Sequence, residues 1–272
     1  MKYPSIITSS IIVLRRLVYA LLNVLHRVFR FSRPDVVVYC YHSIGADTWR
    51  FTVSLPELKS QIDSVLAEAD PLTVDDLERY LTGELLLKRP GFLVTFDDGY
   101  RDILETVDYF RERGIRPVVF ALSQPEAANR AEMENSRPLL DANELHTLSE
   151  NGWSIGCHSA THAFFRGLDD LGEAREITRA KAELEQMIGQ TVSAFAYPKG
   201  GYTESVVRTV RKAGYTLGFT VEHGIVSRGT NPVLIPRVGV DQTHSLSEFA
   251  VMSTIFGIRI KETLTKVVGK FL

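Results

Sequence analysis

Short apolar runs recur along this chain, and stretches with helical periodicity separate them. The runs lack regular polar alternation, which is typical of parallel strands that are buried on both faces. They lie near residues 35, 92, 117, 154, 193, 216 and 234, and the helical patterns include residues 168–188, 204–213 and 245–256. Residues 55–69 and 73–81 predict an additional helical pair between the first two strands. The alternation predicts an α/β fold with a parallel sheet, and about seven repeats favour a (β/α) barrel.

The motif TFDDGY at residues 95–100 places two carboxylates directly after one of these predicted strands. Residues 100–113 predict a helix that is closed by Gly114. Ligands of α/β proteins bind at this carboxyl edge of the sheet. Two adjacent carboxylates are hard to keep ionised together unless a cation separates their roles, so one of Asp97 and Asp98 is expected to bind a metal while the other acts as a base. The simpler alternative is that one of them caps the following helix.

The motif HSATH at residues 158–162 follows a second predicted strand. The four-residue spacing predicts that His158 and His162 lie on one face of a helical turn, where two imidazoles can share one cation. One carboxylate and two imidazoles leave coordination positions open, which is typical of a catalytic metal. A histidine pair alone is more often solvated or hydrogen-bonded, but its place after a second strand favours the metal site. Cys157 is an alternative ligand, although strand alternation directs its side chain to the other face.

Together with FAYPKGGY at residues 195–202, these motifs make the chain resemble the polysaccharide deacetylases with a NodB-homology domain, also called carbohydrate esterase family 4. The motifs occur in the same order and at similar separations, and the resemblance covers roughly residues 34–250. It implies an irregular, seven-stranded (β/α) barrel in which Asp97 is the general base. The implied ligands of a divalent metal are Asp98, His158 and His162. The implied metal is zinc, with nickel, cobalt and manganese as alternatives.

Residues 35–44, with the sequence DVVVYCYHSI, predict another buried strand that ends in a polar cluster. This segment resembles the N-terminal strand of the branch that deacetylates poly-β-1,6-N-acetylglucosamine, in which the strand carrying the acid histidine has moved to the front by circular permutation. The resemblance implies that His42 is the general acid. His244 and His223 are the competing candidates, and a lone histidine after a strand is otherwise more often structural.

The third motif departs from the family pattern Phe-Arg-Pro-Pro-Tyr-Gly at two positions. Ala196 stands where the resemblance implies an arginine that tethers the base, and Arg237 is our candidate for the missing cation. Lys199 stands where the family has an aromatic ring that lines the groove. The implied oxyanion donor is the backbone N–H of Lys199, and Tyr197 and Pro198 are further candidates for substrate contact. Because of these departures, substrate specificity does not carry over.

These roles predict a metal-dependent N-deacetylase. Asp97 would take a proton from the attacking water, the metal and a backbone N–H would stabilise the oxyanion, and His42 would protonate the leaving amine. The expected substrate is an N-acetylated amino sugar in a polysaccharide or in a lipid-linked glycan. Three alternatives stay open: a deformylase of a lipid-linked amino sugar, a catalytically silent carbohydrate-binding protein of the same fold, and a hydrolase of a non-sugar amide.

The first 33 residues are basic and amphipathic, with no acidic residue among them. At about 100° per residue, polar and apolar side chains occupy opposite sides of a predicted helix. The polar side comprises Arg15, Arg16, Asn23, His26, Arg27, Arg30 and Arg33, and the apolar side comprises Leu14, Leu17, Val18, Leu21, Leu22, Leu25, Val28 and Phe29. The longest uncharged run, residues 3–14, is shorter than the roughly 17 residues that a membrane span needs, so we expect an interfacial helix. A signal peptide, or a helix packed on the barrel or on a partner subunit, is the alternative.

We therefore divide the chain into an interfacial helix at residues 1–33, the catalytic barrel at residues 34–257, and a second basic amphipathic segment at residues 258–272. The apolar side of the last segment comprises Ile260, Leu264, Val267, Val268 and Phe271, opposite Arg259, Lys266 and Lys270. Two such segments predict peripheral or monotopic association with a membrane surface, unless they cover the barrel.

Composition sets two further limits. The formal net charge of -2 gives no reason to expect a nucleic acid partner. The chain has two cysteines, Cys40 and Cys157, and each falls inside a predicted strand. Such cysteines are usually small core residues, so the sequence does not require a disulfide.

Overall fold

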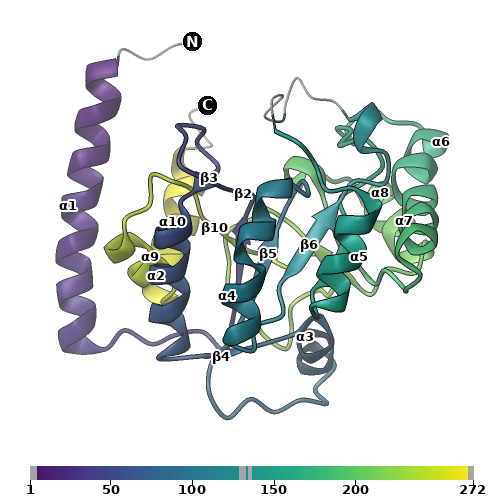
Figure 1. Cartoon of the computed structure of the whole chain (residues 1–272). Helices are drawn as coiled ribbons and strands as arrows, with labels where there is room; N and C mark the ends of the chain where they lie inside the picture. Colours follow the sequence, from purple (N-terminus) through teal and green to yellow (C-terminus); the bar gives the residue numbers. More distant parts are fainter. Residues whose placement is uncertain (1–4, 129–132, 134–136, 269–272) are drawn as a thin grey trace.

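A parallel β-sheet forms the centre of the molecule (Figure 1). The computed structural model describes residues 5–128, 133 and 137–268. Within these residues the strands are β1 (Val36–Tyr41), β2 (Ser43–Ile44), β3 (Thr52–Val53), β4 (Asp70–Pro71), β5 (Gly91–Phe96), β6 (Val118–Ala121), β7 (Ser154–Cys157), β8 (Ala194–Ala196), β9 (Leu217–Phe219) and β10 (Val238–Gly239). The main sheet has the order β10-β1-β5-β6-β7-β8-β9, β4 pairs with β5, and β2 and β3 form a small separate sheet.

The main sheet curls so that its last strand returns to its first. Val238 of β10 pairs in parallel with Tyr39 of β1. Just before β10, Ile235 forms a parallel bridge to Phe219 of β9, so one short segment of chain connects the two edges of the sheet. The prediction of an α/β fold with an irregular, seven-stranded (β/α) barrel is confirmed.

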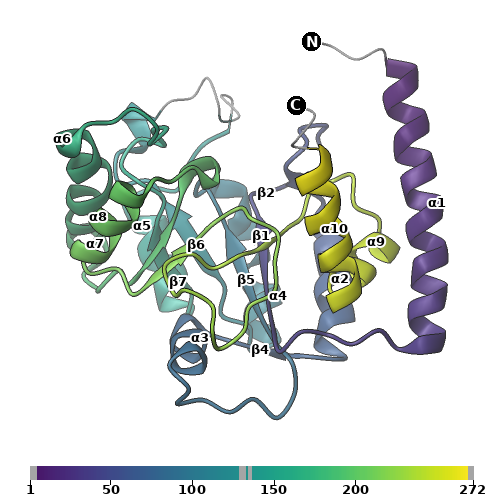
Figure 2. The same cartoon turned by 180° about the vertical axis from the view of Figure 1, so that it is seen from behind.

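Helices surround the sheet in both views (Figures 1 and 2). The α-helices among the described residues are α1 (Ser5–Phe29), α2 (Leu55–Leu66), α3 (Val74–Leu81), α4 (Val107–Glu112), α5 (Ala142–Glu150), α6 (Asp170–Glu173), α7 (Ala180–Ile188), α8 (Glu204–Lys212), α9 (Leu246–Met252) and α10 (Ile255–Val268). The 3₁₀ segments are η1 (Arg101–Thr106), η2 (Pro125–Ala127) and η4 (Pro198–Gly200), and η3 (Ala174–Arg179) is π-helical.

The predicted helical pair between the first two long strands is present as α2 and α3. Both helices begin with a capping box, in which Ser54 pairs with Glu57 and Thr73 pairs with Asp76. Each box satisfies two backbone N–H groups that the helix itself leaves without a partner. These local signals explain why both helix starts were visible in the sequence.

Two other helix predictions were partly wrong. The segment after the Asp-Asp-Gly turn begins as the 3₁₀ segment η1 and becomes α-helical only at α4, although Gly114 closes it with a φ of 66° as expected. Residues 245–256 form two helices rather than one. The break occurs because the Thr254 hydroxyl accepts a hydrogen bond from the Gly257 N–H and so starts a new helix, α10.

Helix α1 lies along the side of the barrel next to α9 in both views (Figures 1 and 2). It contacts the barrel mainly through its polar side. Arg15 donates hydrogen bonds of 2.8 Å to the backbone oxygen and the hydroxyl of Thr243, and Asn23 donates to Ser247 at 3.3 Å. Tyr19, from the same side, is buried. Helix α1 is therefore packed on the barrel, as one of the predicted alternatives described. That alternative did not specify which side of the helix faces the barrel.

The opposite side of α1 is apolar and exposed. Its members are Val13, Leu17, Val18, Leu21, Val24, Val28 and Phe29, which are between 47% and 71% exposed. We call this set the apolar face of α1. Among the described residues, no helix combines the length and the hydrophobicity that crossing a membrane requires.

The chain's last helix, α10, crosses the predicted boundary at residue 258. Its Ile258 side chain is fully buried in the main core, so the start of this segment belongs to the barrel. The side chains from Leu264 onward, on which the prediction of an amphipathic tail mainly depends, lie outside the described residues.

Candidate active site

The predicted site residues meet at the carboxyl edge of the sheet. His42 follows β1, Asp97 and Asp98 follow β5, and His158 follows β7. Parallel strands direct the segments after them to the same edge, which is why residues far apart in the sequence converge. These side chains line a cavity of about 360 Å³.

Asp98, His158 and His162 form a compact, buried group of ligand atoms. The Nε2 atoms of His158 and His162 each lie 3.3 Å from the same oxygen, Oδ1 of Asp98. All three side chains are at most 8% exposed. The predicted helical turn between the histidines is wrong: residues 158–162 form a loop, in which Ser159 and His162 have φ values of 73° and 59°. The loop nevertheless brings both imidazoles to one carboxylate.

The hydrogen bonding of His158 indicates that a cation fits between these groups. Its Nδ1 lies 2.9 Å from the backbone oxygen of Ala196, so Nδ1 carries the proton and donates it. In the neutral ring, Nε2 then presents a lone pair to the Asp98 carboxylate. Burial, followed by the charge of His158, lowers the pKa of His162 to about 4, so the His162 ring is neutral near pH 7. Burial also opposes a charge on His158, but Asp97 and Asp98 outweigh it and raise the pKa of His158, so the two carboxylates favour a positive charge at this position. A divalent metal that replaces the proton would supply this charge, and one carboxylate oxygen with two imidazole nitrogens matches its donor set.

Asp97 is held by a buried arginine. Two nitrogens of Arg237 donate to the two carboxylate oxygens of Asp97 at 2.7 and 2.6 Å. Arg237 is fully buried and also donates to the Thr220 backbone oxygen and the Thr95 hydroxyl. Burial by itself would raise the pKa of Asp97, but the charges of Arg237 and then His158 outweigh it and hold that pKa well below its ordinary value. The contact expected of Arg237 in place of an arginine at position 196 is therefore present.

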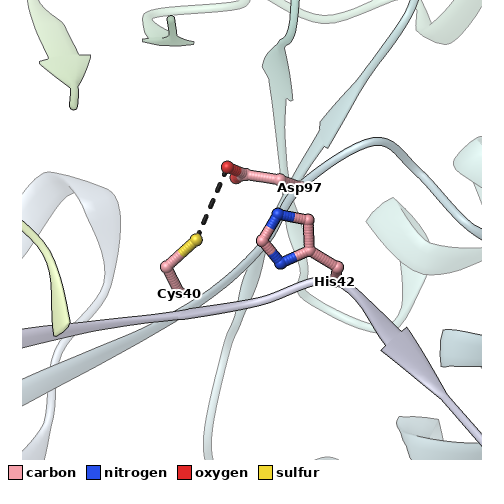
Figure 3. Close-up of side chains that lie close together, drawn as sticks. All are labelled: Cys40, His42 and Asp97. Atoms are coloured by element: carbon pink, nitrogen blue, oxygen red, sulfur yellow. Dashed lines mark hydrogen bonds between the residues drawn. The ribbon is translucent and has the colours of Figure 1, made fainter. Parts of the chain in front are cut away.

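Cys40 and His42 complete the surroundings of Asp97 (Figure 3). The Cys40 Sγ lies 3.5 Å from Oδ2 of Asp97, and burial raises the pKa of the thiol far above its ordinary value, so the thiol stays protonated and donates. A ligand atom of His42 lies within 4.8 Å of both residues. These three side chains also have metal-ligand chemistry, but Arg237 already engages both oxygens of Asp97. Asp98, His158 and His162 therefore remain the predicted metal ligands.

His42 is the candidate acid that the structure places beside Asp97. Its ring packs against Phe51 with 4.8 Å between ring centroids. Its Nδ1 is buried without a hydrogen-bond partner among the described residues. The competing candidates do not line this cavity: His244 accepts a hydrogen bond from the Asp241 backbone N–H, and His223 lies elsewhere. The assignment of His42 as the general acid remains a prediction.

The third motif contributes less to the cavity than expected. Lys199 lines it, in the turn η4, with a φ of 56°. Tyr197 and Pro198 are buried, and the Tyr197 hydroxyl donates to the backbone oxygen of Val233 at 3.0 Å. The Tyr197 ring packs against its aromatic neighbours in the core, so its predicted substrate contact is not supported. The oxyanion role of the Lys199 N–H remains a prediction.

Five residues of the cavity wall were not predicted as site residues: Cys40, Trp49, Phe51, Val221 and Gly239. Trp49 and Phe51 supply aromatic surface, and Cys40 was predicted only as a core residue. The aromatic pair comes from the loop between β2 and β3, whose composition gives no local signal of its destination. For Cys40 a signal existed, because strand alternation places it on the same face as His42, two residues later.

Comparisons with known proteins agree with this geometry. Residues 87–218 match the family model described as polysaccharide deacetylase. YxkH of Bacillus subtilis (strain 168), a polysaccharide deacetylase by name, is 26% identical over 179 residues, which make up 65% of this chain and 61% of YxkH. The similarity thus spans less than two thirds of that relative.

Solved structures share the fold. The IcaB structure from Ammonifex degensii has a TM-score of 0.71 at 22% identity and covers 84% of this chain and 98% of that chain. The Streptococcus pyogenes deacetylase PplD, solved with acetate, has a TM-score of 0.70 at 18% identity and covers 80% and 97% of the two chains. At such identities the likeness establishes the fold alone.

Proposed function

Because residues 87–218 match the polysaccharide deacetylase family model, we propose that this chain is a metal-dependent hydrolase that removes the acetyl group from an N-acetylated amino sugar. The observation that carries the proposal is the convergence of two imidazole nitrogens on one Asp98 oxygen. Next to this group lies a second carboxylate, Asp97, which is paired with the guanidinium of Arg237. A purely structural cluster would not need Asp97 and Asp98 to have such different partners.

The residues divide the work of amide hydrolysis. Asp98, His158 and His162 would hold a divalent cation, which when bound would supply a Lewis acid for the amide carbonyl and for the attacking water. Asp97, kept ionised by Arg237, accepts the proton that the attacking water loses. His42 donates a proton to the leaving nitrogen, so that the products are acetate and a free amine. The lowered pKa keeps Asp97 ionised and therefore able to accept a proton near pH 7.

Arg237 fixes the direction of the base. Its two parallel hydrogen bonds hold the carboxylate plane of Asp97, while the Thr220 backbone oxygen and the Thr95 hydroxyl hold the guanidinium. The Cys40 thiol adds a third donor to Asp97. This arrangement keeps the base at one position without requiring the substrate to order it.

We also propose that the chain binds a membrane surface in a peripheral or monotopic manner. In support, α1 uses its polar side for the barrel and leaves its apolar face exposed. Arg16 and Arg27, on the flank of that face, are exposed, and the first 33 residues contain no acid. An exposed apolar face with basic flanks matches the interface of a bilayer with anionic lipids.

A membrane location favours a substrate in which the amino sugar is attached to lipid or is part of a nascent glycan. The acyl group is proposed to be acetyl, and formyl is the alternative that the same chemistry would accept. Zinc is the proposed metal, because a carboxylate and two imidazoles suit it well.

The function can be tested by measuring acetate and formate release from lipid-extracted membrane glycans and, in parallel, from soluble N-acetylglucosamine oligomers. The purified protein is loaded with zinc, and His158→Ala serves as the blank. We expect acetate release that requires the metal and is greater with the lipid fraction. Release confined to soluble oligomers would contradict the lipid-linked substrate, and no release from either would contradict the deacetylase.

A further inference from the structure

A cavity of about 680 Å³ lies between the last turns of α1, the end of α2 and the start of α9. We call it the basic cavity. Two of its lining residues, Arg33 and Arg89, shortly precede β1 and β5, so the basic cavity lies at the amino edge of the sheet. In Figures 1 and 2 this end of α1 is the lower one. The candidate active site lies at the opposite, carboxyl edge.

Positive charge dominates the lining of the basic cavity. The guanidinium groups that line it are those of Arg27, Arg30, Arg33 and Arg89. Glu68 is the one carboxylate in this lining, and it lies 2.6 Å from Nε of Arg33. Arg89 lies 2.5 Å from Asp70, which is outside the lining. Among the described residues, the guanidinium groups of Arg27 and Arg30 therefore have no acidic partner.

These two guanidinium groups are accessible to a ligand, because Arg27 and Arg30 are exposed. The planar fork of N–H donors on an arginine matches the oxygens of a phosphate group. Cations are common at the C-terminus of a helix because the helix dipole is negative there. The dipole accounts for arginines in the last turn of α1, but not for their convergence with Arg33 and Arg89 from other segments. A bound anion would offset the repulsion between these charges.

The basic cavity also adjoins the apolar face of α1. Val24 and Val28 of this face lie on either side of Arg27 in the sequence and are 57% and 68% exposed. Leu246, which is 49% exposed, lines the cavity itself. A ligand with its phosphate in the basic cavity can therefore cover exposed apolar side chains at the same time. An anionic lipid has this combination of groups, whereas a free phosphate would leave the apolar surface uncovered.

We propose that the basic cavity binds the phosphate group of an anionic membrane lipid, whose acyl chains lie along the apolar face of α1. This proposal rests on the proposed membrane association and adds a defined headgroup contact to it. Because the basic cavity lies at the amino edge of the sheet, the bound lipid is an anchor and not the substrate. It holds one end of α1 at the membrane surface and leaves the catalytic cavity free.

Two exposed arginines of α1 offer a matched test. Arg27 lines the basic cavity, whereas Arg16 does not. Diffuse attraction to vesicles of phosphatidylcholine and phosphatidylglycerol should fall about fivefold in Arg16→Ala. Arg27→Ala also loses charge-assisted hydrogen bonds to the phosphate, so its binding should fall at least about 30-fold. Cosedimentation measures both variants, and equal losses would overturn the site in favour of a diffuse field.

Ala67→Glu provides a second variant that leaves α1 untouched. Ala67 lines the basic cavity, is exposed and ends α2 in a helical conformation, so the barrel should fold, and thermal unfolding checks this. The new carboxylate would face the phosphate, and vesicle binding should fall at least about tenfold. Leu171→Asp adds the same charge at an exposed leucine in α6 and should bind like the wild type. Wild-type binding by Ala67→Glu would contradict the site.

Soluble ligands separate a lipid from a free phosphate. In calorimetry, dihexanoyl phosphatidylglycerol below its micelle concentration should bind the wild type, and Arg27→Ala at least about tenfold more weakly. Glycerol phosphate, which lacks acyl chains, should bind the wild type at least about tenfold more weakly than the short-chain lipid. Equal affinities for the two ligands would replace the lipid by a free phosphate. Undetectable binding of the short-chain lipid to the wild type would refute the site.

Failure of the proposed membrane association has a different signature. In that case the wild type binds no vesicle, while binding of the short-chain lipid still depends on Arg27 and supports the site. Equal vesicle binding by the wild type, Arg27→Ala and Ala67→Glu would leave the membrane association standing and refute the site. Acetate release from soluble oligomers should be unchanged in both variants, and its loss would overturn the assignment of the lipid as an anchor.

Discussion

At the scale of single residues, the Asp97 carboxylate and the Arg237 guanidinium depend on each other. Both are almost completely buried, so each supplies the charge that makes burial of the other tolerable. The two residues are 140 positions apart, and Arg237 is also held by the backbone of the segment after β9. The pair therefore connects the start of the site, after β5, to the segment that completes the barrel.

Replacing one partner should cost stability as well as activity. Arg237→Met leaves a buried carboxylate without its cation, and we expect a loss of about 3–5 kcal/mol in the free energy of unfolding. Asp97→Asn should also destabilise, because it leaves a buried guanidinium. The double variant should regain much of this loss, since no unpaired charge remains, but should stay inactive. Urea unfolding and acetate release measure these effects, and strictly additive losses in the double variant would contradict the argument.

The ligand set predicts a metal content that depends on the two histidines. His158→Ala together with His162→Ala removes two of three ligands, so we expect no zinc to remain after dialysis, with the barrel still folded. His146→Ala is the matched control, because this exposed histidine pairs only with the nearby Glu150. Elemental analysis and circular dichroism give the readouts. Full zinc loading of the double variant would refute the assignment.

The sequence indicated which candidate ligands converge but not the complete surroundings of Asp97. The motifs with Asp97, Asp98, His158 and His162 each follow a strand, and local patterns reveal that much. That Arg237 pairs with Asp97 was inferred only because Ala196 lacked the expected charge. The rings of Trp49 and Phe51 reach the cavity through tertiary packing, which no local pattern records. For Cys40, strand alternation with His42 was the one local signal.

At the scale of elements, the loop between the two histidine ligands shows why spacing alone is ambiguous. A four-residue interval fits a helical turn, but residues 158–162 use left-handed conformations at Ser159 and His162 instead. The Ser159 hydroxyl accepts a hydrogen bond of 2.9 Å from the His162 N–H and closes the loop. Both geometries bring the imidazoles together, so the predicted proximity of the two rings is present, while the predicted helical turn is wrong.

Helix α1 shows the opposite case, in which the periodicity was visible but the buried side was not. Amphipathic helices usually bury their apolar side, whereas α1 places Arg15, Tyr19 and Asn23 toward the barrel. The polar side fits because α9 begins beside Thr243 and Ser247, which accept hydrogen bonds. The apolar face of α1 is thus exposed and available to contact another surface.

The apolar face makes a direct prediction for membrane binding. Leu17→Asp together with Leu21→Asp places two charges on exposed positions of this face, 64% and 62% exposed, so folding should be unaffected. Binding to vesicles of phosphatidylcholine and phosphatidylglycerol should fall at least about tenfold, because charge disfavours insertion into the interface. Cosedimentation measures the effect.

A control variant separates loss of the face from a general effect of charge. Leu171→Asp adds a carboxylate at a leucine that is 81% exposed in α6, away from α1. Its vesicle binding should equal that of the wild type. Equal binding by the α1 variant and the wild type would show that this face is not a membrane contact.

At the scale of the whole molecule, the barrel explains both what was predicted and what was not. Seven strands were visible because each is a local apolar run between turns. Closure was not visible, because it depends on residues 235–239 reaching from β9 to β1. The same closure brings Arg237 under Asp97 and the segment after β10 against α1. The position of Arg237 in the catalytic cavity and the contact between α1 and the barrel therefore both depend on this return of the chain.

The segments that meet at this return contain two histidines that are buried without charge. Burial, then the charge of Lys261, lowers the pKa of His223 to about 3. Burial lowers the pKa of His244 to about 4, with Asp241 opposing and Lys261 reinforcing the shift. An unfolded histidine titrates near 6.5. Between about pH 6.5 and the lowered pKa values of His223 and His244, the unfolded chain binds more protons than the folded one. The stability that these neutral histidines contribute is therefore fully present above about pH 6.5 and is lost as the pH decreases.

This linkage predicts acid sensitivity that can be assigned to one residue. Each pKa unit is worth about 1.4 kcal/mol, so His223 should cost roughly 2 kcal/mol of unfolding free energy at pH 5 relative to pH 7. The glutamine of His223→Gln cannot take up this proton. Between pH 7 and pH 5, the unfolding free energy of this variant should therefore fall by roughly 2 kcal/mol less than that of the wild type. Urea unfolding at pH 7, 6 and 5 measures the difference, with the exposed His146→Gln expected to follow the wild type. If His223→Gln loses as much stability as the wild type, His223 is not protonated on unfolding, and the closure of the barrel does not carry this pH dependence.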